Sequence, residues 1–265
     1  MRQLSHTLLA VAALAALTPE VLHATGIEVQ GTQLLVTDPV GKRLSAAQLV
    51  GTELDLPAVG TIRVVAVEAD PIARFQPTWL HTLELRAAGE TEFRGFCEPD
   101  PSGDRRVVLY PGYFDQSRRY VADKERFSMS CVSGVEAKCL RWGYLPWKQA
   151  PATGESLAPY FEACIQLARA DYCGDDRPTT RNGTTIDVYD RVGVQQPEAD
   201  PGELRFEAGW AAQGAVCVAH TRIVEEVSLK ALPQHCPRLV PDDLGASCTE
   251  ESARERGAIL YNRSR

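Results

Sequence analysis

Five aspartates lie close together in the middle of the chain, and carboxylates at this spacing could hold a metal ion. They are Asp171, Asp175, Asp176, Asp187 and Asp190. Ca²⁺ takes about six to eight oxygen ligands from carboxylates and carbonyls. The spacing does not match the D-x-D-x-D-G calcium loop and lacks its bidentate glutamate. Because aspartate is also a common turn residue, we favour turns, water contacts and ion pairs, with no cofactor, over a calcium site.

Other residue types raise two further kinds of chemistry. Two carboxylates across a cleft could act as general acid and base on a glycan. Cysteine and histidine are close in sequence twice, as Cys217 with His220 and as His235 with Cys236. Residues three apart in a strand point to opposite faces, which disfavours the first pair as a catalytic dyad. No G-x-S-x-G, P-loop or G-x-G-x-x-G motif is present, so we assign no catalytic residue.

The chain has eight cysteines, an even number, which predicts a disulfide framework in an exported protein. No pair has C-x-x-C spacing, which disfavours zinc. The order of the expected elements suggests four bridges, although many other connectivities are open. These are Cys97–Cys131, Cys139–Cys164, Cys173–Cys217 and Cys236–Cys248.

Export is predicted from the first residues. Residues 1–24 contain one cation, an apolar run, a proline break and a small residue at Ala24, as in a cleaved signal peptide. A retained N-terminal anchor is the alternative. The net charge of -7 offers no basic stripe, so neither nucleic acid nor an anionic membrane is an expected partner. No later run is long enough for a membrane span.

The elements that must position these residues divide the chain into two regions. Residues 25–125 lack cysteine until Cys97 and alternate as strands do. Strands are predicted at 27–36, 60–69, 79–87, 91–97, 105–110 and 126–132. Residues 126–265 hold the remaining cysteines and mix helical and strand patterns. The predicted fold class is therefore α+β, with an antiparallel β-rich region followed by a disulfide-stabilised α+β domain.

In the second region, glycines mark the expected helix ends. A helix over 134–143 ends at Gly143, and one over 156–174 ends at Gly174, with Cys164 facing the core. Asn182-Gly183 predicts a hairpin turn. Further strands are predicted at 204–210, 215–220 and 258–262, and helices at 224–232 and 249–257.

Four aromatic residues gather around a proline-containing loop, namely Trp142, Tyr144, Trp147 and Tyr160. Exposed tryptophans could stack on sugars or anchor a partner. Tryptophan is highly buried on average, so we favour a place in the core.

Four segments in this order resemble the ADYC domain, a family of exported bacterial proteins. They are CLRWGYLPW, ACIQLARADYCGDD, TTRNGTTIDVYD and AVCVAHTRI, within residues 127–225. The resemblance implies export and a cysteine-bearing fold but no activity. The family pattern would place glycine where this chain has Asp176. We therefore expect a secreted or periplasmic binding or structural module with an envelope or extracellular ligand. The alternative is an extracellular hydrolase that uses the aspartates, with or without a metal.

Overall fold

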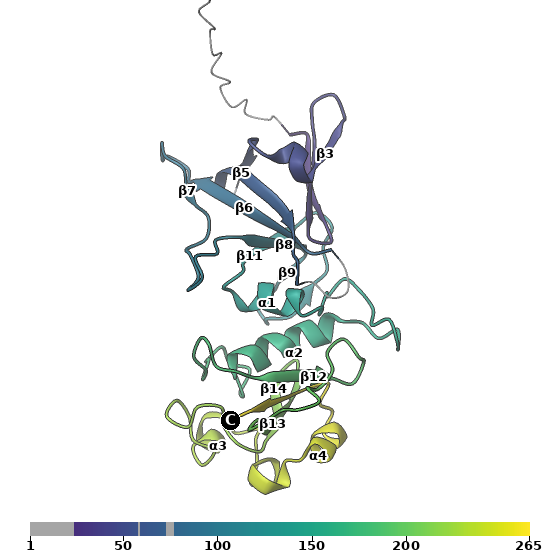
Figure 1. The fold of residues 1–265 in the computed structure, drawn as a ribbon, viewed down its shortest axis with the longest axis vertical. Helices are drawn as coiled ribbons and strands as arrows, with labels where there is room; N and C mark the ends of the chain where they lie inside the picture. The colour runs from purple at the N-terminus through teal and green to yellow at the C-terminus, as the bar shows by residue number, and fades with distance from the viewer. Residues whose placement is uncertain (1–23, 58, 73–76) are drawn as a thin grey trace, which may run out of the picture.

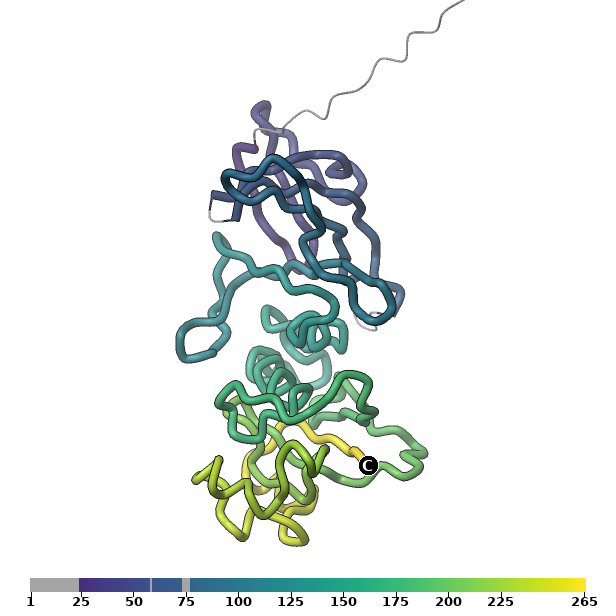
Figure 2. Tube along the Cα trace, turned by 90° about the vertical axis from the view of Figure 1, so that its left-hand side faces the viewer, coloured from purple at the N-terminus to yellow at the C-terminus, as the bar shows by residue number. Residues whose placement is uncertain are grey.

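The computed structural model describes residues 24–57, 59–72 and 77–265. The predicted leader, except for Ala24, lies outside these residues. The chain forms two β-sheet layers with a pair of helices between them (Figures 1 and 2). Across the described ranges, no helix is sufficiently long and apolar to cross a bilayer.

A small three-stranded sheet begins the fold. It contains β1 (Gly26–Gln30), β2 (Gln33–Thr37) and β3 (Arg43–Ser45), followed by the 3-10 helix η1 (Ala46–Leu49). The prediction of one strand over 27–36 was wrong. Gly31 adopts a φ of 63°, which turns the chain into the β1–β2 hairpin.

A six-stranded sheet follows, with strands in the order β11-β8-β6-β5-β4 and β7 paired to β6. Apolar side chains from these strands and from the small sheet form one core. The prediction for 60–69 is confirmed, whereas 91–97 yields only the short β7. The bounds are β4 (Glu53–Leu56), β5 (Gly60–Ala69), β6 (Trp79–Arg86), β7 (Arg94–Gly95), β8 (Val107–Pro111) and β11 (Phe127–Cys131).

A two-stranded ribbon leaves this sheet between β8 and β11. It consists of β9 (Tyr113–Phe114) and β10 (Tyr120–Val121), joined by a tight loop. Phe114 and Tyr120 pack against Phe161, with ring centroids 5.6 Å and 6.1 Å away. The ribbon therefore reaches the helical layer.

The helical layer consists of α1 (Val135–Arg141) and α2 (Ala158–Arg169). The Cys139–Cys164 bridge joins the two helices, so Cys164 faces the core as predicted. Gly143, with a φ of 99°, follows α1 as predicted. The predicted end of α2 at Gly174 was wrong. Ala170 takes a left-handed φ of 48° instead and ends the helix.

The second sheet is antiparallel, with strands in the order β12-β15-β13-β14. Helix α2 contacts β13, β14 and β15, and α4 contacts β13. The β13–β14 hairpin, α4 and β15 were predicted. The bounds are β12 (Asp187–Asp190), β13 (Arg205–Ala211), β14 (Gly214–Val218), α4 (Glu250–Glu255) and β15 (Leu260–Ser264).

Two local predictions in this half were wrong. Asn182-Gly183 forms a turn, but no strand pair flanks it, and β12 pairs with β15 instead. The predicted helix over 224–232 is absent, since residues 224–231 form turns and bends that precede the one-turn α3 (Leu232–His235). Two 3-10 turns follow at η2 (Pro241–Asp243) and η3 (Gly245–Ser247).

All eight cysteines form disulfides. Cys97–Cys131 and Cys139–Cys164 match the expected pairs. The other two predicted pairs were wrong, because Cys217 points to the α4 side of the second sheet whereas Cys173 lies on its α2 side. The bridges are Cys173–Cys236 and Cys217–Cys248.

Candidate functional site

The segment Ala170-Asp171-Tyr172-Cys173 follows α2 directly and is largely buried. Asp171 accepts hydrogen bonds from the backbone N–H groups of Gly174 (2.8 Å), Asp175 (3.2 Å) and Asp176 (2.7 Å). Burial raises the pKa of Asp171, although the bonds from Asp176 and Asp175 act in the opposite direction. The carboxylate therefore serves to fold the loop around itself.

Tyr172 joins this loop to the second sheet. Its hydroxyl donates to Glu207 (3.0 Å) and accepts from the backbone N–H of Arg222 (2.8 Å). Its ring stacks on Trp210 at 5.3 Å between centroids. Burial, followed by the charge of Glu207, raises the pKa of Tyr172 well above its usual value. Asn262 also donates to Glu207 (2.6 Å).

Arg222 and Glu207 form a fully buried ion pair at the centre of this network. Arg222 Nε lies 3.0 Å from Glu207 Oε2, and Arg222 also donates to the carbonyl of Leu167 at the end of α2 (2.8 Å). Buried charges are retained in proteins when they are paired and hydrogen-bonded in this way. The network fixes α2 on the sheet.

Two glycines allow the loop to approach the β13–β14 turn. A Cβ on Gly174 would lie 2.2 Å from the carbonyl oxygen of Gln213, and one on Gly214 would lie 2.7 Å from that of Tyr172. Arg238 donates to the same Tyr172 carbonyl (2.6 Å). Together with Cys173–Cys236, these contacts give the segment a structural role.

The other aspartates occupy separate places. Asp175 pairs with Arg177, Asp187 pairs with Arg263, and Asp190 accepts backbone N–H groups of its own turn and the Tyr144 hydroxyl. Only Asp171 and Asp176 of the five line a common cavity. Within the described ranges, no three His, Cys, Asp or Glu side chains form a group that could hold a metal ion. The donor set does not fit calcium, since backbone N–H groups occupy the Asp171 and Asp190 carboxylates.

The predicted aromatic group lies in or against the core. Tyr144 and Tyr160 are buried and stack at 6.5 Å, and Trp142 and Trp147 pack against the same core. Cys217 and Cys236, which have histidines nearby in sequence, are both in disulfides and carry no thiol.

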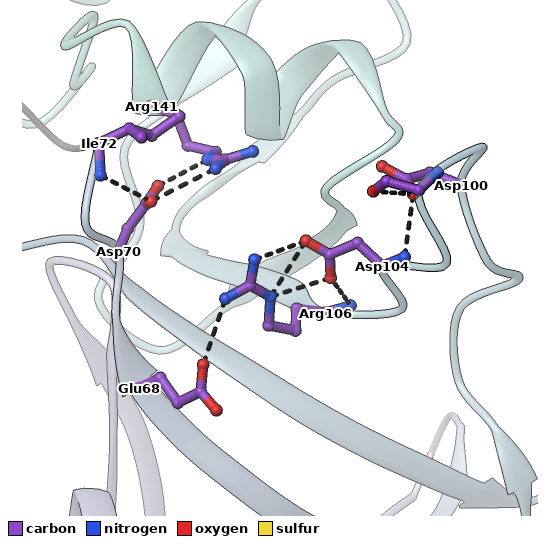
Figure 3. Close-up of polar contacts among 8 residues, drawn as sticks. Glu68, Asp70, Ile72, Asp100, Asp104, Arg106 and Arg141 are labelled. Atoms are coloured by element: carbon purple, nitrogen blue, oxygen red, sulfur yellow. Dashed lines mark hydrogen bonds and ion pairs between the residues drawn. The ribbon is translucent and has the colours of Figure 1, made fainter.

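A second polar cluster joins the six-stranded sheet to α1 (Figure 3). Asp70 accepts from Arg141 Nε of α1 (2.6 Å), and its side chain is buried. Arg106 pairs with Asp104 (2.6 Å) and Glu68 (3.2 Å). The hydrogen bond from Arg106 lowers the pKa of Asp104. These pairs hold the α1 end of the sheet, and sequence spacing gave no sign of them.

A cavity of about 190 Å³ lies where the β9–β10 loop meets the two helices. Its volume is below the ~300–1,000 Å³ of pockets for drug-sized ligands, so it suits a small molecule. The residues that line it are Phe114, Arg118, Glu136, Glu162, Ile165, Gln166, Arg169, Asp171 and Asp176.

The inner wall of this cavity carries hydrogen-bond acceptors. Gln166 is 8% exposed, and its Oε1 has no hydrogen-bond partner among the described residues. Glu162 is 5% exposed. Its Oε1 accepts from the backbone N–H of Tyr120 (2.8 Å), whereas its Oε2 lies 3.1 Å from Arg119 Nε without hydrogen-bond geometry. Glu136 accepts from the Tyr110 hydroxyl (2.6 Å).

Burial shifts the pKa values of the two glutamates in this wall. It raises the pKa of Glu136, against the hydrogen bond from Tyr110, and it raises the pKa of Glu162, against the bond from Tyr120. Raised carboxyl pKa values in a cavity are one mark of functional sites.

The rim of the cavity carries cations. Arg118 and Arg169 both lie beside the carboxylate of Asp176, with Arg118 Nη2 at 3.8 Å. The side chains of Arg118 and Asp176 are 49% and 53% exposed. Three of the four non-glycine residues with positive φ in the described ranges, Arg118, Ala170 and Asp176, lie on or beside this cavity. Such conformations cost energy and gather at functional sites.

The fold and its bridges define a disulfide-stabilised α+β protein of the kind found in oxidising compartments. The family model of the ADYC domain matches residues 46–224, so the chain belongs to the ADYC domain family. The match begins within the first region, ahead of the four segments seen in the sequence. No curated protein and no solved structure matches the chain.

Proposed function

We propose that this protein is an exported binding module of the bacterial envelope or cell exterior, and that the cavity beside the ADYC segment binds its ligand. One observation carries the proposal. The buried Gln166 Oε1 has no partner within the described residues, although it belongs to a side chain that lines a formed cavity. An unpaired buried acceptor is costly, and a ligand donor would remove that cost.

The ADYC segment (residues 170–173) supports this function by holding the cavity-lining end of α2 in place. The Tyr172, Glu207 and Arg222 network and the Cys173–Cys236 bridge hold the end of α2, from which Gln166 and Arg169 reach the cavity. A rigid helix end keeps binding groups in place before the ligand arrives, which reduces the entropy lost on binding.

A hydrolase is the second candidate, and one observation favours it. Glu136 and Glu162 line the same cavity, and burial raises both pKa values. The aspartates, in contrast, are used by turns and ion pairs. If the protein is a hydrolase, Glu136→Gln and Glu162→Gln would each abolish turnover of a soluble glycan, while Asp187→Asn would not.

The binding proposal is tested by NMR on the oxidised protein without its leader. The side-chain amide of Gln166 is the reporter, and a library of small polar metabolites is the probe. We expect a subset to shift this resonance and that of Ile165, but not that of Gln213 on the β13–β14 turn. A library that leaves the cavity resonances unchanged would refute the proposal. Export is tested by sequencing the N-terminus of the mature protein, which should begin near residue 25.

A further inference from the structure

We infer that the cavity recognises a small zwitterion, such as a free α-amino acid, with its ammonium group on the inner wall and its carboxylate at the rim. This inference rests on the proposed function and specifies the ligand. The buried wall carries acceptors and the exposed rim carries guanidinium groups, so the two ends of the cavity have opposite polarity.

The inner wall favours an ammonium group. Gln166 Oε1 lacks a hydrogen-bond partner within the described residues, and the Glu136 and Glu162 carboxylates line the same space, with Glu162 Oε2 already 3.1 Å from Arg119 Nε. An ammonium group has three donors and no acceptor. Hydrogen bonds between a charged donor and such acceptors are stronger than neutral ones. A ligand with only acceptors, such as a carboxylate alone, would meet further acceptors here.

The rim favours an anionic group. Two guanidinium groups, from Arg118 and Arg169, share the single carboxylate of Asp176. Arg118 is held in a left-handed turn, with a φ of 59° and its N–H bonded to the Asp115 carbonyl (2.9 Å). A ligand carboxylate would supply the second negative charge, in the planar geometry that guanidinium binds well.

Substitution of Asp176 tests the inference, because the affinity for the ligand could either rise or fall. The φ of 76° at Asp176 would suit glycine, yet the residue is an aspartate whose carboxylate lies beside both rim arginines. A ligand carboxylate must compete with it. Replacing Asp176 by asparagine, which tolerates a left-handed φ, should leave the backbone unchanged and remove the negative charge that both cations share. Arg169 keeps its hydrogen bond to the backbone carbonyl of residue 176 (2.9 Å).

The experiment measures binding of L-alanine to the oxidised protein by calorimetry. The comparison ligands are N-acetyl-L-alanine, which lacks the ammonium group, and L-alaninamide, which lacks the carboxylate. We expect each to bind about tenfold or more weakly than L-alanine, since each loses a charged hydrogen-bonding group. Equal affinity for all three would overturn the inference.

Three variants locate the site. Gln166→Leu, of similar volume, should weaken L-alanine binding about tenfold, as expected for one hydrogen bond to a charged group. Asp176→Asn should tighten it about two- to fivefold without the same gain for L-alaninamide, as expected for an exposed ion pair. Arg177→Gln is the matched control, because Arg177 is exposed and outside the cavity lining. Weaker binding in Asp176→Asn would overturn the arrangement.

Three simple probes separate this inference from the proposed function. They are methylammonium, acetate and glucose, followed through the Gln166 amide resonance. If one of them shifts that resonance while L-alanine does not, the zwitterion inference is wrong and the binding module stands. If neither L-alanine, nor these probes, nor the metabolite library shifts it, both are wrong.

Discussion

His81 should make the protein less stable in mild acid, and a single substitution should remove most of that effect. The side chain lies on β6 between Val67 and Val107, is 0% exposed, and has no hydrogen-bond partner on either ring nitrogen within the described residues. Burial lowers its pKa from 6.5 to about 4, and the nearby backbone of Val107, which does not reach hydrogen-bond geometry, offsets this only in part. The folded protein therefore holds this ring neutral under conditions in which the unfolded chain protonates it.

The size and sign of the effect follow from these two pKa values. Because the folded pKa lies below the unfolded one, the stabilising contribution is complete above pH 6.5 and is lost as the pH falls toward 4. The full difference corresponds to about 3 kcal/mol of unfolding free energy. Between about pH 7.5 and about pH 4.5 the loss should be roughly 2.5 kcal/mol.

Urea unfolding at these two pH values, with disulfides intact, measures the loss. Glu136, Glu162 and Asp171 act in the opposite direction, because their raised pKa values favour the folded state in acid. The comparison is therefore between the natural protein and His81→Leu, which should lose about 2.5 kcal/mol less on acidification. His235→Gln, at an exposed histidine, should behave as the natural protein. An unchanged pH dependence in His81→Leu, or an NMR titration of His81 near 6.5, would refute the reasoning.

Three further predictions concern the segment after α2. In urea unfolding, Gly174→Ala should destabilise the fold by about 2 kcal/mol or more beyond Gly183→Ala. Both glycines have positive φ, but only a Cβ at position 174 would collide with backbone. Equal losses of stability in the two variants would contradict this close approach. Replacing Cys173 and Cys236 together by alanine should cost about 4 kcal/mol in the same assay, given the 63-residue separation, and a loss below about 1 kcal/mol would be inconsistent with a closed bridge. Arg222→Leu should lower the free energy of unfolding by roughly 3–5 kcal/mol, because it leaves the buried Glu207 carboxylate unpaired. An unchanged melting temperature would show that this carboxylate is solvated.

Local pattern was sufficient for the elements whose signals lie within the segment itself. β5 follows the alternation of residues 60–69, and the glycine at 143 marks the end of α1. The end of α2 was missed because alanine at 170 is not a usual helix terminator, and the buried contacts of Tyr172 enforce its left-handed turn. Two disulfide pairs were predicted wrongly because cysteines meet only when they lie on the same side of a sheet, and order in sequence does not show this.

The cavity could not be predicted, since its residues come from a loop and two helices that meet only in the fold. One signal was available in the sequence. Glu162 and Gln166 are four residues apart on a helix whose other positions in that stretch are apolar and buried. Polar residues at this spacing share one face, and on a helix buried on nearly every side they require a polar space. Arg118 carried no such signal.

The position of β15 bears on the order in which the parts of the chain fold. β15 is the last described strand in sequence, yet it lies between β12 and β13. A chain that emerges from its N-terminus can complete the first sheet and the α1–α2 bridge early, whereas β12 has no neighbour until residues 260–264 arrive. Two of the four bridges also need cysteines beyond residue 230. The second half should therefore be the slow, late part of oxidative folding, exposed to mispairing until its final strand is inserted.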